Sequence, residues 1–314
     1  QNDIKRNEVL CMAKEELRNT DGLTEREFLD QYDVSLYKRP SVSVDTLLFT
    51  VVDGPQLNYR KLPQKELKVL MVKRGNHPYI DTWALPGGFM FVDESLDQAA
   101  YRQLKEEVNV SDIYMEQLYT WGNVHRDPRT RVISCSYMSL ADSSQMEIKA
   151  GGGAWDAQWF TVNYETEEER KKKISGGYVF ENQIKVTLSG REDTLCGVIG
   201  TEKRVVGKTK TVKRHIIKEE GIAFDHAFVI SYGLERLRNK IAYTDIAFNL
   251  MPEYFTLTEL QQVYEVILGK ELLKANFRRK VADRVVETDR VTKNEGHRPS
   301  KLYTLNTNWG CFEE

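Results

Sequence analysis

The sequence predicts an α+β fold: a domain that combines strands with helices, followed by a winged helix-turn-helix domain. Three observations lead to this prediction. Residues 85–110 join a glycine pair to an amphipathic helix that carries carboxylates. Runs of β-branched and aromatic residues lie on both sides of that segment, as expected for strands. Residues 245–314 change to helical periodicity and end in a basic, turn-containing stretch.

The composition is that of a globular chain of one large domain or two. It has 314 residues, 40% hydrophobic and 29% charged, with a net charge of −2. That charge gives no global attraction to nucleic acids or membranes. The longest apolar runs, such as residues 45–53, are too short to span a bilayer, and the start has no signal-peptide pattern. We therefore expect a cytoplasmic protein with no membrane partner.

Four scattered cysteines, Cys11, Cys135, Cys196 and Cys311, form no C-x-x-C pair and no cluster with histidine. Neither a disulfide framework nor a zinc site is indicated, which agrees with a reducing compartment.

The N-terminal two-thirds are predicted to contain a helical extension and then a domain of strands and helices. Residues 1–35 form the extension, because residues 3–32 are charged and helix-like with a break at Thr20-Asp-Gly. Residues 36–224 form that domain, with a β-rich insertion at 176–223 where short strand-like runs alternate with glycine and charged turns. The clearest strands are expected at residues 46–52, 67–74, 116–121, 132–140 and 157–162.

Within residues 85–110, the pair Gly87-Gly88 is expected to form a turn at which the backbone approaches a ligand closely. Ser95 can cap the following helix. The core face of that helix has the i, i+3, i+4 spacing of an amphipathic helix and consists of Leu96, Ala99, Ala100 and Leu104.

On the same helix, Gln103, Glu106 and Glu107 share one face because they stand at i, i+3 and i+4. Carboxylate and carbonyl oxygens are ligands that Mg²⁺ prefers, so Glu106, Glu107 and the Gly88 carbonyl are the predicted metal ligands. Gln103 does not ionise and does not accept a proton at neutral pH. A solvated Glu-Glu pair is the alternative interpretation.

This segment resembles the Nudix box, G-x5-E-x7-R-E-U-x-E-E-x-G-U with U apolar. The matching residues are Gly88, Glu94, Arg102, Leu104, Glu106, Glu107 and Val110. Gln103 stands where the pattern has Glu, and Asn109 where it has Gly. The resemblance implies a Nudix α/β/α sandwich with mixed sheet. It also implies a diphosphate hydrolase scaffold whose base position, Gln103, is degenerate, so that hydrolase activity is weak or absent.

The loop that begins at His125 supplies the predicted ligand-binding cations. Arg126, Arg129 and Arg131 lie between two strands, and guanidinium groups suit diphosphate oxygens. Tyr119 or Trp121 is suited to stack on a base or to pack under a ribose. Ion pairs with nearby acids and packing in the core are the alternatives for these side chains.

Residues 225–244 predict a connecting helix, and residues 245–314 the winged helix-turn-helix domain. Its first helix is capped by Thr256 or Thr258 and ends at Gly269. A second helix over 273–284 precedes two strands, at 285–287 and 301–305, that flank a loop. This order is typical of a winged helix.

The C-terminal unit is also locally basic. Residues 270–304 contain ten Lys or Arg against five Asp or Glu, a net charge of +5. Arg suits guanine and Asn suits adenine in a major groove, while cations of a wing suit phosphates. The predicted DNA-binding residues are Asn276, Arg278, Arg279, Lys280, Lys293, His297, Arg298 and Lys301. A solvated face or a protein-interaction module is the alternative.

This unit resembles the C-terminal winged helix of Nudix-related transcriptional regulators of the NrtR type and their sugar-responsive relatives. The resemblance rests on residues 255–265, 276–280 and 296–303, and upstream on 37–45 and 126–129. It implies a homodimer that binds double-stranded DNA and responds to ADP-ribose, a related nucleotide or a sugar. The alternative is a Mg-dependent Nudix hydrolase of ADP-ribose or nucleoside diphosphate-linked compounds.

Overall fold

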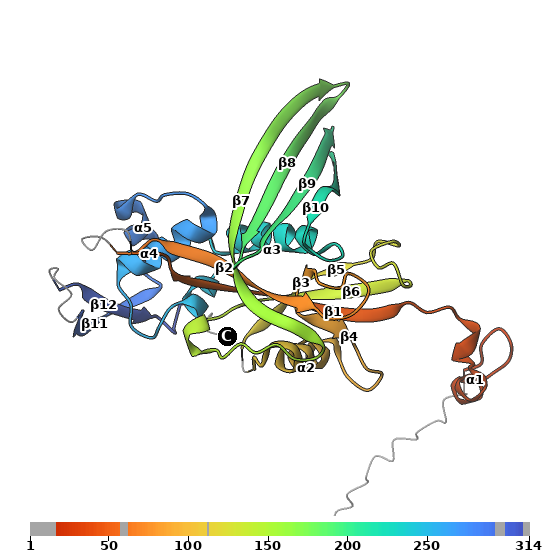
Figure 1. Ribbon diagram of the computed structural model, residues 1–314. Helices are drawn as coiled ribbons and strands as arrows, with labels where there is room; N and C mark the ends of the chain where they lie inside the picture. The colour runs from red at the N-terminus through yellow and green to blue at the C-terminus, as the bar shows by residue number, and fades with distance from the viewer. Residues whose placement is uncertain (1–16, 57–61, 112, 293–298, 310–314) are drawn as a thin grey trace, which may run out of the picture. The chain divides into compact units, whose positions relative to one another are not determined.

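The computed structural model describes residues 17–56, 62–111, 113–292 and 299–309, and the chain divides after Pro40 into two units (Figure 1). The described part of the first unit contains helix α1 (Glu25–Gln31) and the 3₁₀ helix η1 (Val34–Leu36). Thr24 caps α1 through a reciprocal pair of hydrogen bonds with Glu27. The helix expected after the break at Thr20 is thus confirmed, whereas residues 3–16 of the prediction lie outside the described residues.

The second unit is built on one mixed sheet with the strand order β10-β9-β8-β7-β2-β1-β6-β5, on which β3 pairs with β2 and β4 with β1. β1 and β6 run parallel, and the other strand pairs of this sheet are antiparallel. The strands are β1 (Ser41–Asp53), β2 (Lys65–Arg74), β3 (Trp83–Ala84), β4 (Gly87–Phe89), β5 (Met115–Trp121), β6 (Val132–Leu140), β7 (Ala154–Ile174), β8 (Gly177–Ser189), β9 (Thr194–Val206) and β10 (Thr209–Glu220).

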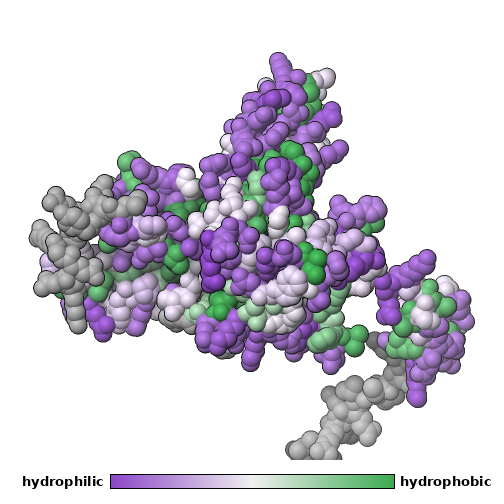
Figure 2. Space-filling model, in the orientation of Figure 1, coloured by the Kyte–Doolittle hydropathy of each residue, from purple (hydrophilic) through white to green (hydrophobic). Residues whose placement is uncertain are grey.

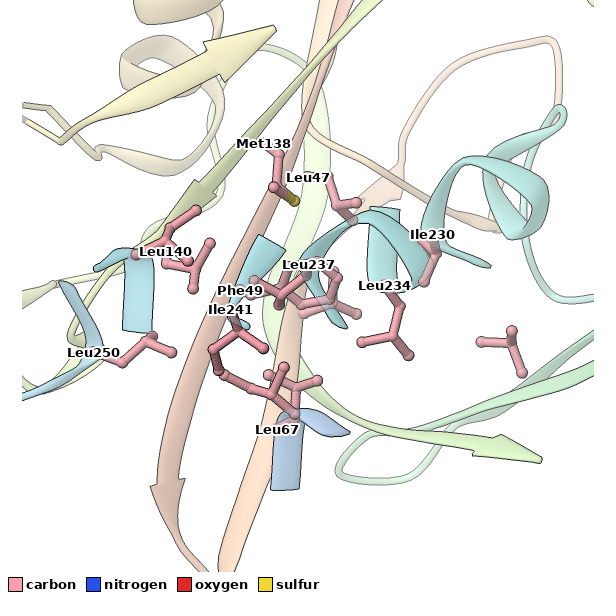
Figure 3. Packing of buried hydrophobic residues seen from close by; sticks show 14 of the residues in the cluster. Leu47, Phe49, Leu67, Met138, Leu140, Ile230, Leu234, Leu237, Ile241 and Leu250 are labelled. Carbon is pink, nitrogen blue, oxygen red and sulfur yellow. The ribbon is translucent and has the colours of Figure 1, made fainter. Parts of the chain in front are cut away.

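Alternate residues of the central strands point to opposite faces of the sheet. Leu47 and Phe49 of β1 belong to the core shared with helix α3 (His226–Lys240), whereas Leu48 belongs to the core shared with helix α2 (Leu96–Val108). This arrangement confirms the predicted α/β/α sandwich. Figure 3 shows the α3 side of this packing, with Leu47, Phe49, Leu67, Met138, Leu140, Ile230, Leu234, Leu237, Ile241 and Leu250 labelled.

Strands β7 to β10 continue beyond the body of the sheet as a four-stranded arm (Figure 1). The short strands expected within residues 176–223 are wrong in length, because β8 and β9 have 13 residues each and β10 has 12. β7 also runs to Ile174 and pairs with β8 along the arm. The charged run 165–173 has little strand character of its own, and cross-strand pairing overrides that weak propensity. Gly176 and Gly207, in the two outer turns, have φ values of 71° and 55° that favour glycine.

The C-terminal part has the predicted winged-helix order. It consists of the 3₁₀ helix η3 (Ile246–Leu250), helices α4 (Leu257–Leu268) and α5 (Lys274–Val281), and strands β11 (Val285–Val291) and β12 (Lys301–Leu305). Thr256 caps α4, and Gly269 ends it in the left-handed conformation, as predicted. The second helix ends at Val281, before the predicted Arg284, because the Arg284 side chain turns inward and donates to the Thr244 carbonyl at 2.8 Å.

The winged helix shares one buried core with the sheet and α3. Phe255, Tyr264 and Phe277 belong to the same buried cluster as Leu47. At its edge, Arg238 of α3 donates to the carbonyl of Ile267 at 2.8 Å. Within the ranges that the structure describes, no helix has the length and apolarity that crossing a membrane requires.

Candidate functional site

The Gly87-Gly88 pair lies in strand β4 against β1, so the expected turn at this pair is wrong. Both glycines are needed for close packing. A Cβ on Gly87 would lie 2.2 Å from the Val44 carbonyl oxygen, and one on Gly88 would lie 2.5 Å from Nε2 of Gln103. The pair therefore lets β4 pack closely against both β1 and α2.

Helix α2 presents the predicted box residues. Ser95 caps it, its buried residues include Ala99, Ala100 and Leu104, and Asn109 ends it with φ 60° in the left-handed region. Asn109 stands where the box has Gly, and asparagine tolerates this backbone conformation.

Gln103, at the base position of the box, and Glu107, a predicted metal ligand, both lie beside β4. The Gln103 amide rests against Gly88, and the partly buried Glu107 carboxylate accepts a 2.7 Å hydrogen bond from the Gly87 N–H. Burial raises the pKa of Glu107 to about 7, although the Gly87 N–H and the nearby Arg74 oppose that rise.

Glu106 points to a different partner. Its carboxylate lies 3.1 Å from the guanidinium of Arg102, one turn earlier on α2. Arg102 also holds Glu94 at 2.8 Å and the Phe89 carbonyl at 3.1 Å. Arg102 thus links the loop before α2 to the helix, and Glu106 is one of its partners.

These contacts fit a magnesium ion poorly. Among the described residues, no three His, Cys, Asp or Glu side chains group where a metal ion could be held. Gln103 is neutral, Glu106 is paired with Arg102, and the carboxylate of Glu107 has a raised pKa. We assign no chemical step to a metal here, and Mg²⁺ at Gly88, Glu106 and Glu107 stays a prediction.

The state of Glu107 makes the stability of the fold depend on pH. Its pKa rises on folding from 4.5 to about 7. The stability that protonated Glu107 contributes to the fold is therefore fully present below pH 4.5 and is lost as the pH rises through 7. Glu107→Gln keeps an acceptor for the Gly87 N–H and carries no charge. We expect this variant to exceed the unmutated protein by about 2 kcal/mol in the free energy of unfolding at pH 8, with no gain at pH 4.

Urea unfolding at both pH values measures this difference. Glu106→Gln is the matched control, since its side chain is 53% exposed. An equal response of the two variants would contradict the buried state of Glu107. The free energy of unfolding of Glu107→Gln should still fall as the pH rises, because burial also raises the pKa of Glu219 to about 7.

A cavity of about 170 Å³ lies beside β4. It combines guanidinium groups with the phenyl rings of Phe89 and Phe224. Its lining residues are Ser43, Asp45, Arg74, Leu85, Gly87, Gly88, Phe89, Arg126, Asp127, Arg129, Phe224 and His226. Of this set, the sequence predicted Gly87, Gly88, Arg126 and Arg129 near a ligand and gave no indication of the other side chains.

Arg126 is bound tightly to the protein itself. Its side chain is only 5% exposed, its Nη2 lies 2.7 Å from Asp225 and 3.5 Å from Asp45, and its Nε lies 3.1 Å from Asp225. His226 beside them accepts from the Leu85 N–H at 2.9 Å through Nδ1, and burial lowers the pKa of His226, so its ring is neutral. Arg126 therefore joins β1 to the start of α3.

Arg129 and Arg74 are the more available cations of the cavity. Arg129 pairs with Asp127 at 2.7 Å but remains 43% exposed, and its guanidinium lies 5.1 Å from the centre of the Phe89 ring. Arg74, which is half-buried, lies 4.9 Å from the centre of the Phe224 ring and donates to the Pro78 carbonyl. Two guanidinium groups, each beside a phenyl ring, are suited to an anionic ligand with flat or apolar groups.

The remaining predicted ligand-binding residues do not line this cavity. Arg131 donates to the Asn123 carbonyl at 2.9 Å. Tyr119 and Trp121 line a separate hollow of about 520 Å³ together with Tyr232 of α3. Trp121 is buried, and its indole N–H donates to Ser136 at 2.7 Å, so it packs in the core.

Helix α5 carries the other predicted surface. Phe277 and Val281 are buried, which turns Asn276, Arg279 and their neighbours outward. Of the predicted DNA-binding residues, Asn276, Arg278, Arg279 and Lys280 on α5 and Lys301 on β12 are exposed. Lys301 forms an ion pair with Glu287 on β11. Lys293, His297 and Arg298 lie outside the described residues.

The chain matches two family models in this order: the NUDIX domain over residues 62–178 and the NrtR DNA-binding winged helix domain over 247–305. It is 31% identical over 285 residues to the ADPR responsive transcriptional repressor NtrR of Acinetobacter baylyi, covering 89% of this chain and 88% of the relative.

Two solved structures share the architecture. A MutT/nudix family protein from Enterococcus faecalis superposes with a TM-score of 0.63 at 25% identity, covering 90% of this chain and 94% of that one. Shewanella oneidensis NrtR complexed with a 27mer DNA gives 0.56 at 29% identity, covering 85% and 94%. The chain therefore belongs to the NrtR-type family, in which a Nudix domain is joined to a C-terminal winged helix.

Proposed function

We propose that this protein is a transcriptional regulator that binds operator DNA through α5 and responds to ADP-ribose bound in the Nudix domain. The observation that carries the proposal is that an exposed cationic helix is joined to a Nudix domain in which Glu106 pairs with Arg102 and Glu107 accepts from the Gly87 N–H. The A. baylyi relative is named as an ADPR responsive repressor, which supports the same assignment.

The cavity supports a diphosphate ligand better than a neutral sugar. Arg74 and Arg129 present charge-assisted donors, and the rings of Phe89 and Phe224 offer flat contact surfaces. Its volume of about 170 Å³ is smaller than typical drug-sized pockets, so it accommodates the diphosphate and an adjoining ribose, with the rest of the ligand outside. A free sugar would offer neither guanidinium group a charged partner.

We also propose that the protein works as a homodimer in the cytoplasm. Two winged helices that read half-sites about 34 Å apart need two copies of the chain. Sedimentation equilibrium measures this state, and a monomer at the concentration that saturates DNA would contradict it.

Fluorescence anisotropy on a duplex of the protein's own promoter tests the function. We expect binding that ADP-ribose changes and that ribose or glucose leaves unchanged. AMP release in the same samples with Mg²⁺ monitors hydrolysis. Ordinary enzymatic turnover without any DNA binding would replace the proposal by the hydrolase alternative.

Arg129→Ala is expected to weaken ADP-ribose binding by about 10- to 100-fold, because a charge-assisted bond to the ligand contributes about 1.5–3 kcal/mol. Isothermal titration calorimetry measures this loss. Arg131→Ala is the matched control, since Arg131 comes from the same loop and does not line the cavity. Equal affinities of the two variants for ADP-ribose would contradict a contact between Arg129 and the ligand.

A further inference from the structure

The outer half of the β7–β10 arm is strongly basic. Residues 169–182 and 201–214 contain ten Lys or Arg against three Glu, a net charge of +7 in a chain of net charge −2. Figure 2 shows hydrophilic residues over most of the visible side of the arm. Neither the Nudix cavity nor the winged helix accounts for this charge.

Strand register sorts these charges between the two faces of the arm. Lys171, Phe180, Lys203 and Val212 stand opposite one another across the four strands, and so do Lys173, Tyr178, Val205 and Lys210. Since side chains two residues apart share a face, Lys171, Lys173, Lys203 and Lys210 lie on one side of the sheet. We call these four residues the lysine face.

Glu181 and Glu202 of the arm lie on the opposite face, whereas Glu169 shares the face of Lys171 and Lys173. On the opposite face, Glu168 pairs with Arg170 at 3.1 Å and Glu181 with Lys172 at 2.8 Å. Within the part of the chain that the structure describes, no member of the lysine face forms an ion pair. The charge of this face is therefore free to meet an external anion.

Two aromatic rings on the same face of the arm contact lysines of the lysine face. The Lys171 ammonium lies 4.4 Å from the centre of the Tyr178 ring and 5.2 Å from that of Phe180, and Lys203 lies 5.6 Å from Phe180. Such cation–π contacts restrict long side chains that would otherwise lose entropy on binding. Lys171, Lys203 and Lys210 border a groove of about 550 Å³ that reaches Glu235 of α3.

We propose that the lysine face binds the phosphate backbone of double-stranded DNA outside the segment read by the winged helix. Lysine ammonium groups are point charges that suit phosphates without reading sequence. The contact adds affinity and salt dependence to DNA binding but no base preference. It goes beyond the proposed function, in which α5 alone contacts DNA.

The contacts of the lysine face favour double-stranded DNA over a single-stranded nucleic acid and over a protein partner. A single strand needs open aromatic faces on which to stack its bases, and here the Lys171 ammonium lies over both the Tyr178 and the Phe180 ring. A protein partner needs an apolar centre that excludes water, whereas Lys171, Lys173 and Lys210 are exposed and unpaired. The regular cation rows instead match a repeating phosphate chain.

The test measures salt-dependent binding of the full chain to a labelled random-sequence duplex of about 60 base pairs, so that no operator is needed. The arm variant is K171Q/K203Q/K210Q. The matched control K172Q/R204Q/K213Q removes three cations from the opposite face of the same strands. A third variant, R278Q/R279Q/K280Q, removes cations from α5, and thermal melting verifies that all three fold.

Loss of three phosphate contacts is expected to lower the slope of log affinity against log salt by about 2 to 3 in the arm variant and to leave the control unchanged. Equal slopes for the arm variant and the unmutated protein, with a loss only in the α5 variant, would overturn the inference and leave the proposed function intact. A loss in the arm variant without one in the α5 variant would support the arm and contradict DNA binding by α5. Equal losses in the arm variant and its control would mean that only net charge matters and would also overturn the inference.

Discussion

Alanine at Arg278, Arg279 and Lys280 together is expected to reduce operator affinity by at least about 100-fold, because each of the three base or phosphate contacts contributes about 1–3 kcal/mol. The three side chains are exposed on α5, while Phe277 anchors the opposite side of the helix in the core. The fold does not depend on the exposed cations, so the loss should appear in binding and not in thermal stability.

Anisotropy titrations with the promoter duplex measure this loss. Asn276→Ala separates base reading from charge, since the Asn276 amide accepts from Arg279 at 3.2 Å and carries no charge itself. That variant should discriminate less between operator and random DNA while its salt dependence stays the same. Unchanged affinity of the triple variant would show that α5 does not enter the DNA groove.

The second large effect is on stability. Arg126→Ala is expected to lower the free energy of unfolding by about 3–5 kcal/mol, because it leaves the Asp225 and Asp45 carboxylates buried without their cation. For a chain of this size the melting temperature should fall by roughly 10 °C. Differential scanning calorimetry measures both quantities.

Arg129→Ala is the matched comparison, since Arg129 forms a similar 2.7 Å ion pair but is 43% exposed. Its loss should cost less than about 1 kcal/mol. If the two variants melted together, Arg126 would not be the link between β1 and α3 that its contacts indicate.

Local signals made part of this structure predictable from sequence. The capping residues Ser95 and Thr256 and the left-handed positions Asn109 and Gly269 act within one or two turns of a helix, so neighbouring residues suffice to place them. The contact of Gln103 with Gly88 was not predicted, because it depends on how β4 packs against α2.

The cavity was only partly predictable because its walls come from distant segments. Arg74 ends β2 and Phe224 precedes α3, and no pattern near Arg129 points to either residue. Tyr119 illustrates a second limit. The register of β5 against β6 shifts between Gln117 and Tyr119, so simple alternation along the strand does not give the face on which the ring lies.

Helix α3 links the cavity to the winged helix. Asp225, just before its first residue, pairs with Arg126, and His226 lines the cavity. Arg238 near its end donates to the last turn of α4. Its fifteen residues span about 22 Å. Because α3, α4 and α5 contribute to one closely packed core, a shift of α3 at the cavity would displace the winged helix as well.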